Sequence, residues 1–161
     1  MTRIGLDCKL YRNTATGNSA YNTPTWVEIV NAKDVTVPLT KGEADASRRG
    51  STWKTRIGTL KDASIDFQLI QQDGDASFTA LFDSYLHGTP IDLLVLNGSI
   101  TDTAAQGLRA TCEVFNFQDS QALEGAQTFD VSAKPCPATN PGSTPPGAPI
   151  VPVWFEVPGA P

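Results

Sequence analysis

Residues 41–70 read KGEADASRRGSTWKTRIGTLKDASIDFQLI, and they join a long basic segment to a clear strand. In the last part, apolar side chains at Ile65, Phe67 and Leu69 alternate with polar ones, which is typical of a strand with one buried face. The preceding 21 residues carry six basic side chains, two acidic ones and Trp53. Arginine and tryptophan are typical contact residues, and a long loop in a compact domain is usually functional or disordered. We therefore expect a long loop at about 41–56 that makes contacts.

The same alternation recurs along the chain and predicts a mainly β fold. An Asn97-Gly98 pair is a strong hairpin-turn signal. Pro38 cannot donate a ladder hydrogen bond, so a strand is expected to end there or to lie at an edge. The remaining strands are predicted at residues 4–11, 26–30, 34–39, 91–96, 108–117 and 128–133.

One helix is predicted at about residues 75–87, because apolar side chains repeat there at spacings of three and four. Asp73 and Asp75 precede it as helix-capping residues, and Gly88 follows it as a C-terminal cap. A calcium loop is the alternative for the two aspartates, but the required downstream glutamate is missing. The expected architecture is a β-sandwich or barrel of two packed sheets with this one flanking helix.

Composition changes at Pro135, since nine of the twelve prolines lie in residues 135–161. We expect a β domain at residues 1–135 and a Pro-rich C-terminal extension at 136–161. Part of the extension is apolar and alternates like a strand, which favours strand addition to a sheet edge. A disordered tail is the alternative. The residues concerned are Val151, Val153, Trp154, Phe155 and Val157.

Charge is divided unevenly along the chain. Residues 1–61 hold ten basic and five acidic groups, net +5, whereas residues 62–161 hold two basic and twelve acidic groups, net −10. Such a division indicates either two solvated faces or self-association between unlike regions of two copies. The pI of about 4.7 argues against general nucleic-acid binding. Without a long apolar run or a signal-peptide core, we expect a soluble protein that contacts no membrane.

The residues for catalysis and for cofactor binding are scarce. His87 is the only histidine, and Cys8, Cys112 and Cys136 form no close pair, so no metal site, disulfide or nucleophile–histidine pair is indicated. We interpret Cys8 and Cys112 as small buried apolar residues in strands and Cys136 as a thiol of the tail, and we expect a reducing compartment. Phosphate-binding glycine motifs are absent as well. We therefore predict no catalytic residue, no metal and no cofactor, and a protein that is not an enzyme.

Taken together in their order and spacing, several segments resemble the phage tail tube family, the major tail proteins of long-tailed bacteriophages. The resemblance covers about residues 4–135, and the chain from Cys136 onward departs from the family's compact core. The segments are VTVPLTKGEAD at 35–45, RRG at 48–50 with Trp53, GTLKDAS at 58–64, FTAL at 78–81, GTPID at 88–92, QGLRA at 106–110 and VSAKP at 131–135.

The resemblance implies a small β-sandwich or barrel whose copies form hexameric rings that stack into a hollow tube. DNA passes through such a tube during infection without specific binding. The implied partners are further copies of the chain, the tail terminator, the tape measure and baseplate or tail-tip proteins. The implied location is the virion tail, after synthesis in the host cytoplasm. Two alternatives stay open: the tube of a contractile injection or secretion system, and a monomeric β-sandwich binding module.

Within this interpretation the basic loop reaches a neighbouring copy or the next ring and pairs with acidic groups in the region 62–130. The alternative is a mobile loop in solution. Asp66 and Glu113 are candidates for the wall of the tube, with ordinary solvated surface as the alternative. The predicted inter-subunit residues are Lys41, Glu43, Asp45, Arg48, Arg49, Trp53, Lys54 and Arg56.

Overall fold

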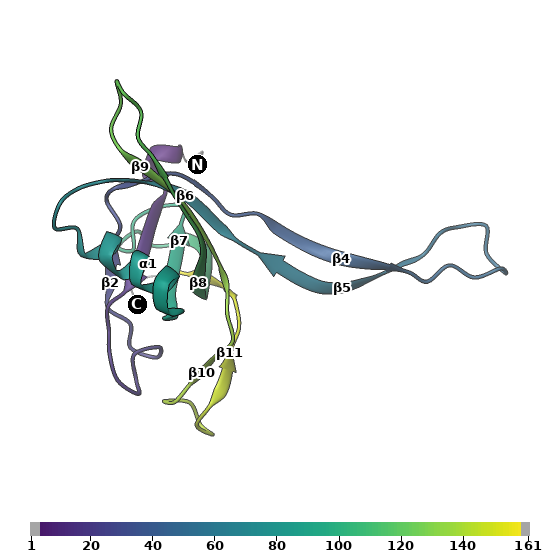
Figure 1. Cartoon of the computed structure of the whole chain (residues 1–161). Coiled ribbons are helices and arrows are strands. Elements are labelled where there is room, and N and C mark those ends of the chain that lie inside the picture. The colour runs from purple at the N-terminus through teal and green to yellow at the C-terminus, as the bar shows by residue number, and fades with distance from the viewer. Residues whose placement is uncertain (1–3, 159–161) are drawn as a thin grey trace.

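The computed structural model describes residues 4–158, and most of its strands belong to one antiparallel sheet (Figure 1). The order across this sheet is β2-β1-β7-β8-β9-β6-β3, and β12 also pairs with β8. The mainly β class is confirmed. The strands are β1 (Lys9–Asn13), β2 (Trp26–Glu28), β3 (Ala32–Thr36), β6 (Ile65–Ile70), β7 (Ile91–Leu96), β8 (Gln106–Ser120), β9 (Thr128–Pro135) and β12 (Val153–Glu156).

The sheet curls strongly around its own core. Strands β2 and β3 stand at opposite ends of the strand order, yet only three residues connect Glu28 to Ala32. Four residue steps reach at most about 14 Å. Six inter-strand steps across a flat sheet would measure about 29 Å. The two ends must therefore approach each other, although β2 and β3 do not pair within the described residues, so the expected barrel is not closed.

The inside of the curl is the main apolar core. Ile65, Phe67 and Leu69 of β6 are buried there, as their alternation predicted. Strand β7 is covered on both faces, because Leu93 belongs to this core while Leu94 belongs to a second, smaller cluster. That second cluster also contains Val157 from the C-terminal segment.

Helix α1 (Ala76–His87) packs on β7 and β8 at one side of the curled sheet. It begins at Asp75, whose carboxylate accepts a hydrogen bond of 2.8 Å from the Ser77 amide. It ends at Gly88, which has φ 67°, a left-handed conformation that favours glycine. Leu81 is fully buried in the main core. The predicted helix and the capping role of Asp75 are thus confirmed.

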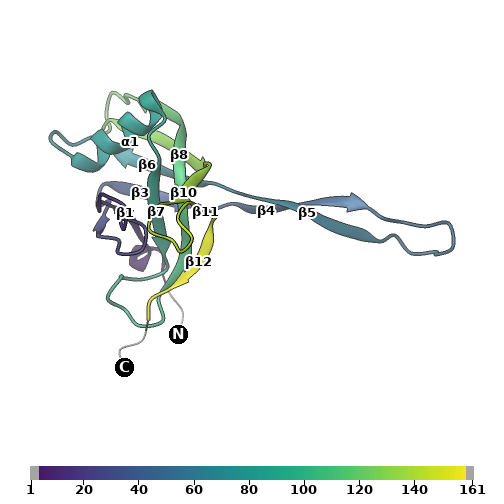
Figure 2. The same cartoon turned by 90° about the horizontal axis from the view of Figure 1, so that it is seen from below.

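Within the segment predicted as a loop at 41–56, residues 46–55 do form a loop, but residues 41–45 and 56 belong to the strands of a long hairpin. Strands β4 (Leu39–Asp45) and β5 (Arg56–Ala63) pair with each other and with no other strand of residues 4–158. Only residues 46–55 form the turn at its end. Figures 1 and 2 show this hairpin, called here the arm (residues 39–63), projecting far from the body. These strands were not predicted, because both faces of the arm are exposed and its sequence therefore needs no alternation of apolar side chains.

Some predicted boundaries also shift. The strand expected at 4–11 begins only at Lys9, because a 3-10 turn, η1 (Gly5–Asp7), occupies its start. The strand expected at 34–39 divides: β3 ends before Pro38 and β4 begins after it. After Pro135 the chain forms the small hairpin of β10 (Ala138–Asn140) and β11 (Ala148–Ile150) before β12. Within the described part, no helix is long and apolar enough to cross a membrane.

Candidate self-assembly surfaces

The arm exposes both of its faces to solvent. Every residue of β4 is exposed, and so is every residue of β5 except Ala63 at its base. Leu60 is 88% exposed and Ile57 is 62% exposed, although both are apolar. A two-stranded hairpin by itself is marginally stable in water. The arm is therefore a surface whose apolar side chains lack a partner within the described chain.

Charges along the arm are arranged unevenly. Lys41 and Lys61 lie directly opposite each other across the two strands, which is an unfavourable like-charge pair. Further out, Arg56 forms an ion pair with Glu43. Hydrogen bonds from Ser47 hold the pKa of the Asp45 carboxyl below its usual value. Near its base the arm thus holds two lysines beside the single carboxylate of Asp62, whereas its middle is locally neutralised.

The arm tip (residues 46–55) carries Arg48, Arg49 and Lys54 and no acidic residue. Among the described residues, none of these three forms an ion pair. Trp53 is 80% exposed at the tip, and its amide is held only by a 3.1 Å hydrogen bond to the Ser51 hydroxyl. The structure therefore brings the predicted residues of the 41–56 segment onto one protruding element, with the cations and the tryptophan at its end.

A second surface of interest is the exposed side of helix α1. Phe82, Tyr85 and Leu86 are about half exposed there. The ring of Phe117 on β8 lies 5.4 Å from that of Phe82 and 6.2 Å from that of Tyr85. Phe117 in turn packs against Phe129 at 5.1 Å. The exposed rings are therefore backed by a packed aromatic cluster.

The two carboxylates considered for a tube wall lie in different surroundings. Asp66 lines a polar hollow of about 410 Å³ on the sheet face of β3, β6, β8 and β9, together with Asp34 and Asp130. Glu113 lies instead beside Gly88 at the end of the helix. Only Asp66 therefore belongs to an acidic sheet face.

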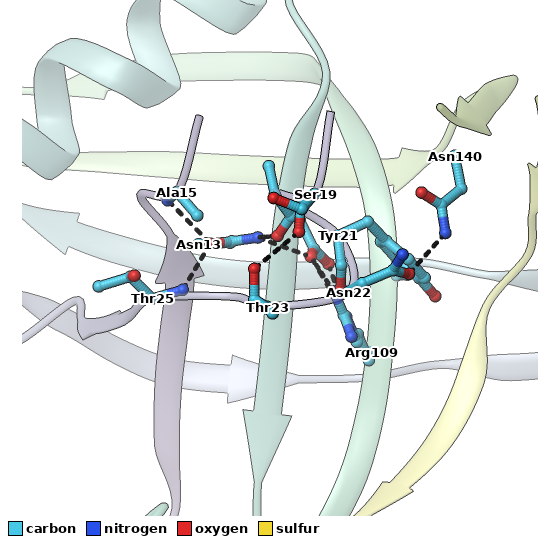
Figure 3. Close-up of polar contacts among 12 residues, drawn as sticks. Asn13, Ala15, Ser19, Tyr21, Asn22, Thr23, Thr25, Arg109 and Asn140 are labelled. Carbon is cyan, nitrogen blue, oxygen red and sulfur yellow. Dashed lines mark hydrogen bonds and ion pairs between the residues drawn. The ribbon is translucent and has the colours of Figure 1, made fainter. Parts of the chain in front are cut away.

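Arg109, one member of a buried ion pair, fixes the long loop at 14–25 to the sheet through Tyr21 (Figure 3). Arg109 of β8 contacts Asp92 of β7 at 2.6 Å, and their side chains are 9% and 10% exposed. Arg109 also donates a 2.8 Å hydrogen bond to the Tyr21 carbonyl and lies 3.9 Å from the centre of the Tyr21 ring. The same guanidinium lies 5.1 Å from the centre of the Trp26 ring.

Asparagines complete this attachment. The side-chain oxygen of Asn13 accepts hydrogen bonds of 2.9 Å from the amides of Ala15 and Thr25. Asn22 accepts a 2.7 Å hydrogen bond from Asn140, which ties the loop to the β10–β11 hairpin. Arg109 alternates with apolar residues along β8, and this alternation does not reveal that its own side chain is buried. The signal that could have identified it is the pairing of an arginine with an aspartate in two strands that are otherwise apolar.

The C-terminal segment lies along β8. Trp154 and Phe155 of β12 pair with Leu108 and Gly107, and the Trp154 indole donates a 2.8 Å hydrogen bond to Gln106. Val157 is buried, whereas Val151 and Trp154 are exposed. A groove of about 710 Å³ separates this segment from the base of the arm. Gly107 is required here, because a Cβ on it would lie 1.7 Å from the Val95 carbonyl oxygen.

The described residues contain no group of three or more histidine, cysteine, aspartate or glutamate side chains that could hold a metal ion. All three cysteines are free thiols; Cys112 is buried in β8 as expected, whereas Cys8 is exposed just before β1, so its predicted burial in a strand is wrong. Burial raises the pKa of Cys112 to about 12, so this thiol is not a nucleophile near neutral pH.

By sequence the chain matches no protein-family model and no curated protein. By structure it resembles the SPP1 tail tube, with TM-score 0.70 and 12% identity over 98% of this chain and 81% of the other. It also resembles a chain in the tail of an empty gene transfer agent particle with C6 symmetry, with TM-score 0.65 and 14% identity over 85% and 96%.

A third similar structure is a chain of an anti-feeding prophage baseplate, with TM-score 0.53 and 4% identity over 93% of this chain and 91% of the other. At such low identities these comparisons establish a common fold. The described chain therefore has the fold of tail tube proteins.

Proposed function

We propose that this chain is a structural, non-enzymatic subunit of a phage tail tube, in which hexameric rings stack into a hollow conduit for DNA. The observation that carries the proposal is the arm, a long hairpin with exposed apolar side chains on a body that has the tail tube fold. The C6 symmetry of the similar gene transfer agent tail supports rings of six.

The arm supports assembly on energetic grounds. Fully burying a leucine or isoleucine side chain contributes about 1.5–3 kcal/mol. Leu60 and Ile57 gain little of this in the isolated chain, because both are mostly exposed. The like-charged pair of Lys41 and Lys61 adds a further cost that nearby carboxylates of another copy would offset. Assembly would thus stabilise an element that is poorly stabilised in the monomer.

Net charge is consistent with a DNA conduit. Six copies of a chain with net charge −5 give a formal charge of −30 per ring. A negatively charged wall repels phosphates and prevents DNA from binding during transit. The acidic sheet face that contains Asp66, with Asp34 and Asp130, is our candidate for this wall. The proposed partners are other copies, the tail terminator, the tape measure and baseplate or tail-tip proteins in a virion tail.

The similarity to a baseplate chain of an anti-feeding prophage supports one alternative, the tube of a contractile injection system. Both proposals require self-assembly, so they share the first experiment. A chain with residues 46–55 replaced by a two-residue Asn-Gly turn keeps the body and loses the arm tip. We expect it to remain a folded monomer, by circular dichroism and analytical ultracentrifugation, at concentrations where the wild type sediments as tubes.

A separate variant, Arg48→Glu with Arg49→Glu, tests the charge of the tip without shortening the arm. We expect loss of tube growth with an unchanged melting temperature, since both side chains are exposed. Full-length tubes from this double variant would show that the tip charge is not used in assembly.

A further inference from the structure

The exposed aromatic side of helix α1 is the surface that best fits the arm tip. We infer that the tip (residues 46–55) of one copy docks on this side of α1 in a second copy. The receiving surface, called here the helix patch, consists of Phe82, Tyr85 and Leu86. The inference rests on the proposed function, because it names the contact through which copies join.

The tip and the helix patch of one chain are far apart. In both Figure 1 and Figure 2 the arm leaves the body on the side away from α1. The tip therefore meets the helix patch of a different copy. Because the two surfaces differ, the contact is heterologous, and repeated head-to-tail contacts of this kind generate rings or open helical filaments rather than closed dimers.

The helix patch is apolar, exposed and rigidly supported. Phe82 and Leu86 are four residues apart and share one face of the helix, and Tyr85 lies beside them. Phe117 backs both Phe82 and Tyr85. Within the described residues nothing covers these three side chains. Exposed apolar patches of this kind usually mark interaction sites. A preformed aromatic surface can bind tryptophan through apolar contact and arginine through cation–π contact.

Charge complementarity favours the arm tip as the occupant. Asp83 lies on the same helix, and Asp119 lies across the strands from Phe129 in the aromatic cluster. Hydrogen bonds from His87 and Thr89 hold the pKa of Asp83 below its usual value, so its negative charge persists at neutral pH. Arg48, Arg49 and Lys54 of the tip would face these carboxylates, while Trp53 lies on the rings.

The acidic hollow that contains Asp66 is the competing receiver for the basic tip. It offers Asp34, Asp66 and Asp130 as partners for the cations. However, the residues that line it include no exposed aromatic side chain, and Phe67 among them is buried. Trp53 would stay in solvent there. The helix patch matches both the charge and the apolar surface of the tip.

The first test is a charge exchange between the two surfaces. Tyr85→Lys with Leu86→Lys places two cations opposite the basic tip. We expect the concentration needed for tube formation to rise at least tenfold. Adding Arg48→Glu and Arg49→Glu to the same chain should restore assembly. The matched control is Leu6→Lys with Leu123→Lys, which changes two other exposed leucines and should assemble like the wild type.

A helix-patch variant that forms tubes like the wild type would overturn the inference while leaving the proposed function intact. The proposed function fails on a different result, namely a wild-type chain that never assembles, and the inference then fails with it. A melting curve establishes that each variant is folded before its assembly is measured.

A second measurement detects the contact itself and does not require the double-lysine chain to fold. Chains carrying Trp53→Cys and chains carrying Leu86→Cys, both in a Cys8→Ser background, are mixed, assembled and oxidised mildly. We expect covalent dimers on a non-reducing gel from the mixture and far fewer from either chain alone. Assembled tubes that give no dimer above the single-chain controls would overturn the inference.

Discussion

The buried pair of Asp92 and Arg109 gives a sharp test of how the body is held together. The perturbation is Asp92→Asn, which keeps the size of the side chain and removes its charge. The Arg109 guanidinium then stays buried without its carboxylate, which lies 2.6 Å away in the wild type. Truncating one partner of a buried ion pair typically costs 3–5 kcal/mol, because the remaining charge is uncompensated.

The structure places the expected cost near the lower end of this range, at about 3 kcal/mol. The carbonyl of Tyr21 still accepts a hydrogen bond from Arg109, and the Tyr21 and Trp26 rings still contact its guanidinium. For a domain of this size, each kcal/mol lowers the melting temperature by about 2–4 °C. The variant should therefore melt about 6–12 °C below the wild type.

The assay combines thermal unfolding, urea unfolding and hydrogen exchange of the tip-deleted monomer, in which assembly does not contribute. We expect faster exchange in residues 14–25 and not in β6. The control is Glu28→Gln, which breaks a 2.9 Å ion pair to Lys9 whose side chains are about one-third exposed (36% and 34%). That change should cost less than about 1 kcal/mol. If Asp92→Asn costs no more than Glu28→Gln, the pair does not hold the loop as argued.

The remaining predictions address packing, thiol accessibility and the C-terminal segment. Gly107→Ala should destabilise the monomer by several kcal/mol, because the new Cβ would lie 1.7 Å from a backbone oxygen. Urea unfolding measures this loss, and a value below about 1 kcal/mol would mean that β7 and β8 can separate there. At pH 8, iodoacetamide should label the exposed Cys8 rapidly and Cys112 only after unfolding, because burial raises the pKa of Cys112 to about 12. Modification of Cys112 in the native chain, detected by mass spectrometry, would contradict its burial. Deleting residues 136–161 removes β12 and the buried Val157, and it should lower the stability of the monomer as well as of the tubes. An unchanged melting temperature would show that β12 contributes no net stability.

Local patterns predicted the elements that have one buried face. The alternation at Ile65–Leu69 identified β6, and the spacing of Phe78, Leu81 and Phe82 identified α1, because burial on one side imposes a period on the sequence. The arm has no buried side, so no period marked its strands. Only its highly charged composition was informative, and that composition led us to predict a loop.

Two other features depend on contacts between distant residues. The curl of the sheet follows from the short link between β2 and β3, which no local pattern reveals. Arg109 is buried because the loop at 14–25 folds over it, and the alternation of residues in β8 does not reveal this contact. The predicted contact residues of the arm do lie together on one protruding element, and their assignment to an interface stays a proposal.

The most direct test of the central proposal is electron microscopy of the purified wild-type chain at increasing concentration. We expect hollow tubes whose cross-sections show six subunits around an open channel, with the arm of each copy in contact with another copy. A chain that stays monomeric at millimolar concentration, or that forms only closed dimers, would contradict it.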